Sequence, residues 1–230
     1  MSVADRRQGG MADVHPESPA WIARRLEQAS AYDRIGDRYN EAFPRKEGQL
    51  RSGEWLLERL PPRARVLDMG CGTGLPTARQ LIGGGLSVTG IDISAGMCAI
   101  AGRNVPALEV RQVDVMSLEP EDGPYDAVVA FFSFLNLPRH SIPGALRLVH
   151  RLLVPEGLFS LAMVESDIDD VPIPFLGGLL RVSGYLRDEL RSEVETAGFR
   201  VEEETALSCS PATTEAQPEV QLFLNCRRAV

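Results

Sequence analysis

Three glycines and an aspartate stand at a spacing that could hold a negatively charged ligand. Asp68 ends a short apolar run, and the chain then turns through Gly70, Gly72 and Gly74, with glycine at every second position. Glycine lets backbone N–H groups approach a ligand closely, and the N-terminus of the helix expected after this loop favours negative charge. The loop therefore suits a phosphate or a carboxylate. Because glycine-rich turns are common, such a site needs support from other residues.

Two further aspartates stand where later apolar runs end. Asp92 closes the second run and Asp114 closes the third, while the fourth run leads into the uncharged Phe131. A carboxylate at the end of a second strand can accept hydrogen bonds from both hydroxyls of a ribose. Asp114 is placed to accept a hydrogen bond from the amino group of an adenine. Acids and a glycine loop at the ends of successive strands predict a nucleoside site at the switch point of an open sheet.

The same segments resemble the successive motifs of class I S-adenosylmethionine-dependent methyltransferases. They read VLDMGCGTG, VTGIDIS, VDV and YDAVVAFFSF in this order, and the similarity covers residues 32–161. Upstream, the pairs Tyr32-Asp33 and Tyr39-Asn40 are similar to the helix that closes over the cofactor in members acting on small molecules. The resemblance implies S-adenosylmethionine as cofactor and S-adenosylhomocysteine as product. It also implies in-line transfer of a methyl group to an O, N or C atom of a small molecule.

The resemblance assigns the two halves of the cofactor to different loops. Residues 70–74 would hold the methionine end, and Phe131 would offer its backbone carbonyl to the methionine amine. Asp92 would take the ribose, and Asp114 with the amide of Val115 would bind the edge of the adenine. The complete set of cofactor-binding residues that it implies is Tyr39, Asp68, Gly70, Cys71, Gly72, Gly74, Asp92, Ile93, Met97, Asp114, Val115 and Phe131.

Two other functions compete with methyl transfer. A nicotinamide-dependent oxidoreductase would need the fingerprint G-x-G-x-x-G, but Leu75 stands where its third glycine belongs, and an acid at Asp68 is not part of it. A methyltransferase-like protein that binds S-adenosylmethionine without transferring the methyl group would keep the same motifs. Formation of S-adenosylhomocysteine with any acceptor distinguishes an enzyme from this second alternative.

His140 and Glu165 are the candidate catalytic residues. Displacement at an activated methyl group depends mainly on placing the acceptor in line, and a hydroxyl acceptor also benefits from a general base. His140 follows the fourth strand and has a reference pKa near neutrality, which suits a base, although it also fits a polar residue ahead of a helix. Glu165 opens an acidic run directly after the fifth strand and is expected to face the pocket. A solvated loop is the alternative for that run.

Other residues could line the site or simply pack. Tyr39 and Tyr185 are candidates of this kind, with packing as the default interpretation. Arg45 and Lys46 precede the first strand and could pair with the cofactor carboxylate, or remain solvated. The apolar, Pro- and Gly-rich residues 171–180 lack a clear periodicity. We expect them to form a flap over the acceptor site or to pack under the N-terminal helix.

Alternating strand and helix patterns indicate the elements that position these residues. Strands are expected at residues 65–69, 87–91, 108–113, 125–131, 157–164, 200–207 and 220–227. Apolar residues at helical spacing over 141–153, and Ser94 as an N-cap for a helix reaching 104, are typical of the intervening helices. The fold class is therefore α/β, Rossmann-like and doubly wound, with a mostly parallel seven-stranded sheet and helices on both faces. No helix separates the last two strands, so the final strand is expected to lie antiparallel.

The chain is long enough for one such domain and too short for two. Residues 1–20 lack apolar periodicity and are predicted to form a disordered leader. Residues 21–60 are predicted to form an N-terminal helical lid, and residues 61–230 the domain that binds S-adenosylmethionine.

Charge and composition limit the classes of substrate and the cellular location that are expected. The net charge of −8, with arginines scattered among acids, argues against a nucleic-acid substrate and favours a small molecule. Apolar runs fall short of the ~20 residues of a membrane helix, and the polar start MSVADRRQGG is unlike a signal peptide. A cytoplasmic location without membrane attachment is expected. The four cysteines form no metal-binding pattern, so no metal is predicted, and the oligomeric state is not readable.

Overall fold

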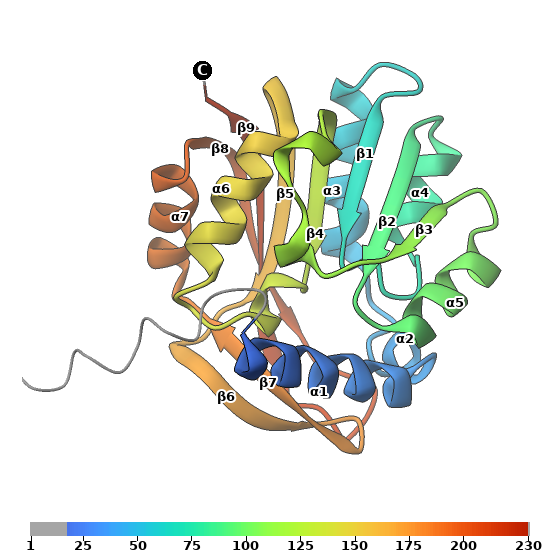
Figure 1. Cartoon of the computed structure of the whole chain (residues 1–230), viewed down its shortest axis with the longest axis vertical. Coiled ribbons are helices and arrows are strands. Elements are labelled where there is room, and N and C mark those ends of the chain that lie inside the picture. Colours follow the sequence, from blue (N-terminus) through green and yellow to red (C-terminus); the bar gives the residue numbers. More distant parts are fainter. Residues whose placement is uncertain (1–17, 230) are drawn as a thin grey trace, which may run out of the picture.

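One seven-stranded sheet forms the centre of the protein (Figure 1). The computed structural model describes residues 18–229. The strand order is β3-β2-β1-β4-β5-β9-β8, and β9 is antiparallel to both of its neighbours, as expected for the final strand. This confirms the predicted Rossmann-like α/β fold. The strands are β1 (Arg65–Met69), β2 (Ser87–Asp92), β3 (Glu109–Gln112), β4 (Tyr125–Phe131), β5 (Leu153–Val164), β8 (Phe199–Cys209) and β9 (Glu219–Arg228).

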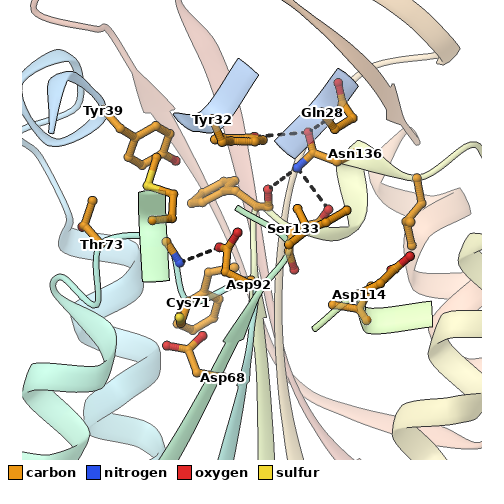
Figure 2. Close-up of a pocket in the computed structure, with 18 of the residues that line it drawn as sticks. Gln28, Tyr32, Tyr39, Asp68, Cys71, Thr73, Asp92, Asp114, Ser133 and Asn136 are labelled. Carbon is orange, nitrogen blue, oxygen red and sulfur yellow. Dashed lines mark hydrogen bonds between the residues drawn. The ribbon is translucent and has the colours of Figure 1, made fainter. Parts of the chain in front are cut away.

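The parallel strands carry the predicted acids to one edge of the sheet. β1 lies between β2 and β4, and Asp68 is in register with Gly90 on one side and Val129 on the other. Asp92 is the last residue of β2, so both carboxylates lie near the carboxyl ends of neighbouring strands (Figure 2). β4 is buried along almost its whole length, because a central parallel strand is covered on both faces.

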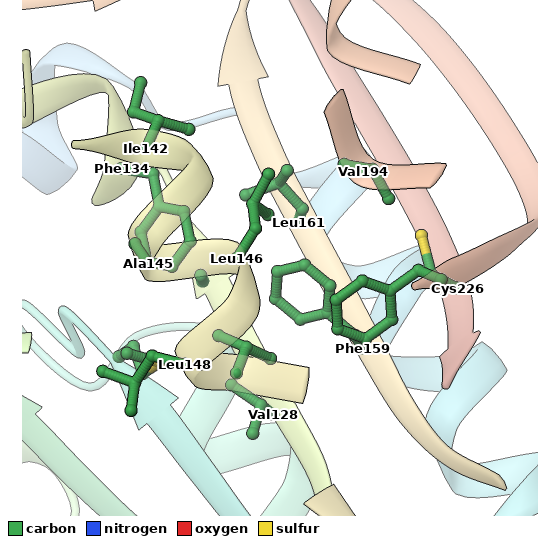
Figure 3. Close-up of a cluster of buried hydrophobic side chains, with 14 of the residues drawn as sticks. Val128, Phe134, Ile142, Ala145, Leu146, Leu148, Phe159, Leu161, Val194 and Cys226 are labelled. Carbon is green, nitrogen blue, oxygen red and sulfur yellow. The ribbon is translucent and has the colours of Figure 1, made fainter. Parts of the chain in front are cut away.

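Helices cover both faces of the sheet. The residues of α3 (Glu47–Arg59), α4 (Thr77–Gly83) and α5 (Ala95–Asn104) contribute to one apolar cluster, and those of α6 (Ile142–Leu152) and α7 (Arg187–Thr196) contribute to another. Ser94 caps α5 as predicted, since its Oγ accepts a hydrogen bond from the amide of Met97 at 2.9 Å. Between α6, α7 and the sheet, the ring of Phe159 lies between those of Phe134 and Phe199 at centroid distances of 6.4 and 5.0 Å (Figure 3).

The N-terminal segment is helical, as predicted, and forms three helices. α1 (Pro19–Ile35) and α2 (Arg38–Ala42) precede α3, and Figure 1 shows α1 lying across the lower end of the sheet. Of the predicted leader, residues 1–17 lie outside the described part of the chain, while residues 19 and 20 already belong to α1. The helix begins there because the Oγ of Ser18 accepts a hydrogen bond from the amide of Trp21 at 3.2 Å and Pro19 occupies the first turn.

Residues 171–180, which lack a clear periodicity in the sequence, form regular structure in the fold. They belong to a two-stranded antiparallel hairpin of β6 (Ile168–Phe175) and β7 (Gly178–Gly184). The prolines of β6 are tolerated because a two-stranded ribbon leaves one edge of each strand unpaired. The expected packing under the N-terminal helix is confirmed, since Leu176 and Leu180 share an apolar cluster with Ala31 and Ile35 of α1. Beside them, Gln28 of α1 exchanges two hydrogen bonds with the backbone of Arg181, at 3.0 and 3.1 Å. Within residues 18–229, no helix is long and apolar enough to cross a membrane.

Candidate functional site

A pocket lies at the carboxyl ends of the central strands, beneath α1 and α2 (Figure 2). The loops after β1, β2, β3 and β4 form one side, and the N-terminal helices form the other. Of the predicted cofactor-binding residues, those that line it are Tyr39, Asp68, Gly70, Cys71, Gly72, Asp92, Ile93, Met97, Asp114, Val115 and Phe131. The tertiary structure therefore brings nearly all of the predicted set into one cavity.

Gly74 is the exception. Its amide donates a hydrogen bond to the carbonyl of Cys71 at 2.9 Å, and its φ of +75° is in the left-handed region. A Cβ added at this position would lie 3.1 Å from the side chain of Val105, so the residue packs against the end of α5 instead of lining the pocket. The expectation that Gly74 contacts the cofactor is corrected: this glycine shapes the loop.

The glycine loop is held in place by β2. The amides of Gly70 and Cys71 both donate to the carbonyl of Ile91, at 2.8 and 2.9 Å. Gly70 has a φ of +81°, and a Cβ there would lie 2.4 Å from the Cβ of Ser133. A side chain at this position would therefore force the loop after β4 away from the pocket, in addition to straining the backbone.

Asp92 joins two of the loops that line the pocket. Its Oδ2 accepts a hydrogen bond from the amide of Gly72, and its Oδ1 accepts one from the amide of Ser94, both at 2.9 Å. The side chain is buried, and this burial raises the pKa of the Asp92 carboxyl although the two amides act in the opposite direction. Asp92 thus fixes the glycine loop against the start of α5, a structural role that the sequence did not reveal.

Asp68 is a buried acid with an unsatisfied oxygen. Its residue is 3% exposed, and its Oδ2 makes no hydrogen bond to any residue in the range 18–229. Burial, with a smaller contribution from the charge of Asp92, raises the pKa of the Asp68 carboxyl to about 7. Buried polar atoms are normally paired. An unpaired carboxylate oxygen in the lining of a cavity therefore indicates that a ligand donates a hydrogen bond to it.

Asp114 is already in contact with the N-terminal helix. The indole Nε1 of Trp21 donates a hydrogen bond to its Oδ2 at 3.0 Å, and the amide of Met116 donates to its Oδ1 at 2.9 Å. The sequence placed Asp114 in the site but did not predict Trp21 as its neighbour, because the two residues belong to segments far apart in the chain.

Asn136 links the loop after β4 to α1 and was missed by the sequence analysis. Its Oδ1 accepts hydrogen bonds from the Nε2 of Gln28 and the hydroxyl of Tyr32, at 3.0 and 3.1 Å. Its Nδ2 donates to the carbonyls of Phe132 and Ser133 at 3.3 and 3.2 Å (Figure 2). The only available signal was a single amide in an otherwise apolar stretch after β4, which is weak without knowledge of what packs on it.

The segment predicted to close over the site touches two of its loops. The Oδ1 of Asp33 accepts hydrogen bonds from the Oγ of Ser94 at 2.5 Å and the amide of Gly96 at 2.8 Å, at the beginning of α5. The Nδ2 of Asn40 donates to the Oγ1 of Thr73 in the glycine loop at 2.8 Å. The described N-terminal helices are therefore connected to the loops after β1 and β2 as well as to Asn136.

Several predicted site residues lie elsewhere. The expectation that Glu165 faces the pocket is wrong, because its carboxylate forms an ion pair with Arg187 at 2.7 Å, and this hydrogen bonding lowers the pKa of Glu165. His140 is exposed and lies outside the pocket. The hydroxyl of Tyr185 donates to the carbonyl of Arg139 at 3.2 Å, which agrees with packing.

The basic residues before β1 also lie outside the pocket. Arg45 pairs with Glu47 at 3.0 Å, and the Nζ of Lys46 sits 4.8 Å from the ring centroid of Tyr39. Neither side chain lines the cavity, so the expectation that they reach a ligand carboxylate is corrected. Between α2 and α3, Pro44 and Arg45 are exposed, whereas Phe43 is buried.

The comparisons with known proteins agree with this geometry. A family model described as a methyltransferase domain matches residues 66–157. Over these residues the chain carries a methyltransferase domain of the class I S-adenosylmethionine-dependent type. The matched residues include the glycine loop, Asp92 and Asp114, whereas α1, α2 and the β6–β7 hairpin lie outside them. The match decides against the nicotinamide alternative, and S-adenosylmethionine is the cofactor of the family.

Individual relatives cover parts of the chain. A malonyl-[acyl-carrier protein] O-methyltransferase from Enterobacter lignolyticus is 33% identical over 60% of this chain and 54% of its own length. A trans-aconitate 2-methyltransferase from Methylobacterium nodulans is 36% identical over 48% of the chain and 43% of its own length. The chain thus spans about half the length of these curated relatives. The structure of a DhpI–SAH complex has a TM-score of 0.69 at 22% identity and covers 90% of the chain and 98% of its own, which shows a shared fold.

Proposed function

We propose that the protein transfers a methyl group from S-adenosylmethionine to a small molecule. The observation that carries the proposal is the convergence of Asp68, Asp92 and Asp114 on one cavity at the ends of successive parallel strands. The alternative, binding of the cofactor without transfer, uses the same cavity and differs only in whether an acceptor reacts.

The donor set of the pocket fits this cofactor. Asp68 offers an unpaired buried carboxylate oxygen, which a cationic amine would satisfy, and Phe131 lines the same cavity. Each oxygen of Asp92 accepts one amide hydrogen bond and keeps a second lone pair for a ribose hydroxyl. Asp114 and the amide of Val115 would bind the adenine edge, with Ile93 and Met97 as its apolar neighbours in the pocket lining.

The bound cofactor supplies a methyl group on a positively charged sulfur. The residues of the chain then have to place the acceptor in line with that group and keep water out. Tyr32 and Tyr39 cover the cavity, and burial raises the pKa of both phenols, so they remain protonated and act as hydrogen-bond donors. Positioning by α1 and α2 is therefore the main contribution expected from the lid that we propose for residues 21–60.

The acceptor class is inferred from charge and from one relative. The relative from Methylobacterium nodulans acts by its name on trans-aconitate, a small molecule. The net charge of −8 opposes binding to a nucleic-acid backbone. The Enterobacter relative acts by its name on a malonyl group of an acyl-carrier protein, so a carrier-bound acceptor is the competing outcome.

A methyl-transfer screen with a binding control tests this function. S-adenosylhomocysteine is titrated by calorimetry, with NAD as the negative control, and labelled S-adenosylmethionine is offered with a panel of small phenols, amines and acids. We expect the protein to bind S-adenosylhomocysteine but not NAD. We also expect a labelled product with at least one small acceptor. Binding without any labelled product, also with a malonyl acyl-carrier protein, would favour the non-catalytic alternative. Labelling of the carrier-bound malonyl group alone would contradict the small-molecule acceptor.

A further inference from the structure

Arg24 of α1 presents an unused hydrogen-bond donor to the pocket. Its side chain is 14% exposed and lines the cavity, and its Nη1 is buried without a hydrogen-bond partner among residues 18–229. Leaving a charged donor buried and unpaired costs free energy, which a protein avoids unless the group serves a ligand. The methyl-transfer mechanism above does not use Arg24.

The remaining contacts of Arg24 fix the orientation of its guanidinium. Its Nη2 donates to the carbonyl of Asn136 at 2.8 Å and lies 2.6 Å from the Oδ1 of Asp170 on β6. These partners come from the loop after β4 and from the hairpin, so the group is held from two sides. A guanidinium fixed in this way is suited to a planar anion, because its N–H groups match the two oxygens of a carboxylate.

The acid nearest to Arg24 is shared with a second guanidinium. Asp170 also pairs with Arg181, whose Nε and Nη2 lie 2.9 and 2.6 Å from its Oδ2. One carboxylate thus serves two guanidinium groups. Arg25, which also lines the pocket, lies 3.9 Å from Asp114. None of these contacts reaches the Nη1 of Arg24, which stays available to an anion in the pocket.

The position of Arg24 along α1 distinguishes two sources of that anion. One turn before it, Trp21 contacts Asp114, at the proposed adenine end. The glycine loop, where the methionine end is proposed to bind, is contacted by Asn40 of α2. The carboxylate of the cofactor is therefore expected near α2 and not near Arg24. The adenosine part of the cofactor has no anionic group.

We propose that Arg24 binds a carboxylate of the methyl acceptor, so that the substrates of this protein are small carboxylic acids. This assignment rests on the proposed function, since it presumes that an acceptor enters the same cavity. The acceptor enters with its carboxylate on the Nη1 edge of Arg24, between Asn136 and the hairpin, and Arg25 adds positive charge at the same end.

Matched acids and amides test the proposal. The probes are benzoate and benzamide, succinate and succinamide, and 4-hydroxybenzoate and 4-hydroxybenzamide, titrated into the protein with and without saturating S-adenosylhomocysteine. We expect at least one acid to bind about tenfold more tightly than its amide, the size of one charge-assisted hydrogen bond. In Arg24→Gln this preference should fall to about twofold or less. Arg34→Gln is the matched control, because Arg34 is exposed on the same helix and bonds only Ser30 in the described structure.

Three outcomes overturn the proposal. Wild-type protein that binds no acid more tightly than its amide removes the carboxylate site, and this comparison needs no variant. A preference that survives in Arg24→Gln moves the site to another residue. If Arg24→Gln weakens binding of S-adenosylhomocysteine but not of 5′-deoxy-5′-methylthioadenosine, which lacks the amino-acid end, the anion is that of the cofactor. Failure of wild-type protein to bind S-adenosylhomocysteine instead contradicts the proposed function, and the titrations without it still decide the role of Arg24.

Discussion

The indole of Trp21 donates a hydrogen bond to the carboxylate of Asp114 over 3.0 Å. This contact connects the first turn of α1 to the loop after β3, and both residues line the pocket. A ligand that binds Asp114 therefore meets a residue of the N-terminal helix at the same time. Occupation of the pocket and the stability of α1 are coupled through this pair.

Replacement of Trp21 by Phe is expected to loosen α1. Phe keeps most of the apolar contact but loses the hydrogen bond, which contributes about 1 kcal/mol. Amide exchange across residues 19–35 should then become roughly fivefold faster in hydrogen-exchange measurements. S-adenosylhomocysteine should slow exchange in residues 19–46 of wild-type protein more than in β8. Equal protection of residues 19–46 and β8 by the ligand would mean that the N-terminal helices only pack on the domain and do not close over the site. Trp55→Phe is the control, because the described contacts of its indole nitrogen include no hydrogen bond.

Asp92 and Asp114 are expected to contribute unequally to cofactor binding. Asp92→Ala should weaken binding of S-adenosylhomocysteine by about 10²-fold, because two charge-assisted hydrogen bonds are lost. It should also lower the melting temperature, since the amides of Gly72 and Ser94 lose their acceptor. Asp114→Ala should cost about tenfold and relax discrimination against an inosine analogue, which lacks the amine. Calorimetric titration measures both affinities, with the exposed Asp188→Ala as control. Affinity of Asp92→Ala within about twofold of wild type would refute the assignment.

The stability of the ligand-free protein is expected to fall as the pH rises toward neutrality. Asp68 has an ordinary carboxyl pKa when unfolded and a pKa of about 7 when folded. Between these values the folded state binds the extra proton, so stability decreases with rising pH and levels off above about 7. Asp68→Asn should remove this decrease and raise the melting temperature at pH 8, while weakening S-adenosylhomocysteine binding. Thermal unfolding at pH 5 to 8 measures the effect.

The exposed Asp188→Asn variant is the control for this profile. It removes an exposed carboxylate that does not line the pocket and should leave the wild-type profile in place. An Asp68→Asn variant with an unchanged profile would mean that Asp68 is ionised throughout the range and paired with a group that the ligand-free structure does not provide.

His140→Ala is expected to leave turnover close to that of wild type once an acceptor is known. His140 is exposed outside the pocket, so the general-base role suggested by the sequence has no support in its position. Initial rates with labelled S-adenosylmethionine provide the measurement, and Tyr32→Phe provides the contrast, since Tyr32 lines the cavity and bonds Asn136. A loss of about 10²-fold or more in His140→Ala with intact cofactor binding would restore the base role.

Local sequence patterns were sufficient to predict the sheet, the order of its elements along the chain and the loops that line the site. Strand and helix patterns are local, and the glycine loop and the acids at strand ends lie within the elements that position them. The seven expected strands, the N-cap at Ser94 and the antiparallel last strand were predicted for this reason. In parallel sheets the carboxyl ends of neighbouring strands meet at one edge, so the strand pattern alone places Asp68 and Asp92 together.

Contacts between side chains of distant segments could not be predicted in this way, because they depend on how the elements pack. Trp21 and Asp114, Tyr32 and Asn136, and Arg24 and Asp170 are paired because α1 crosses the ends of the strands and packs on the β6–β7 hairpin. His140 is exposed and Glu165 pairs with Arg187, although both follow strands whose carboxyl ends lie on the ligand side of the sheet. Local periodicity fixes which face of an element is apolar, but the crossing of a helix over a sheet depends on the whole buried surface, and the contacts of the site follow from that crossing.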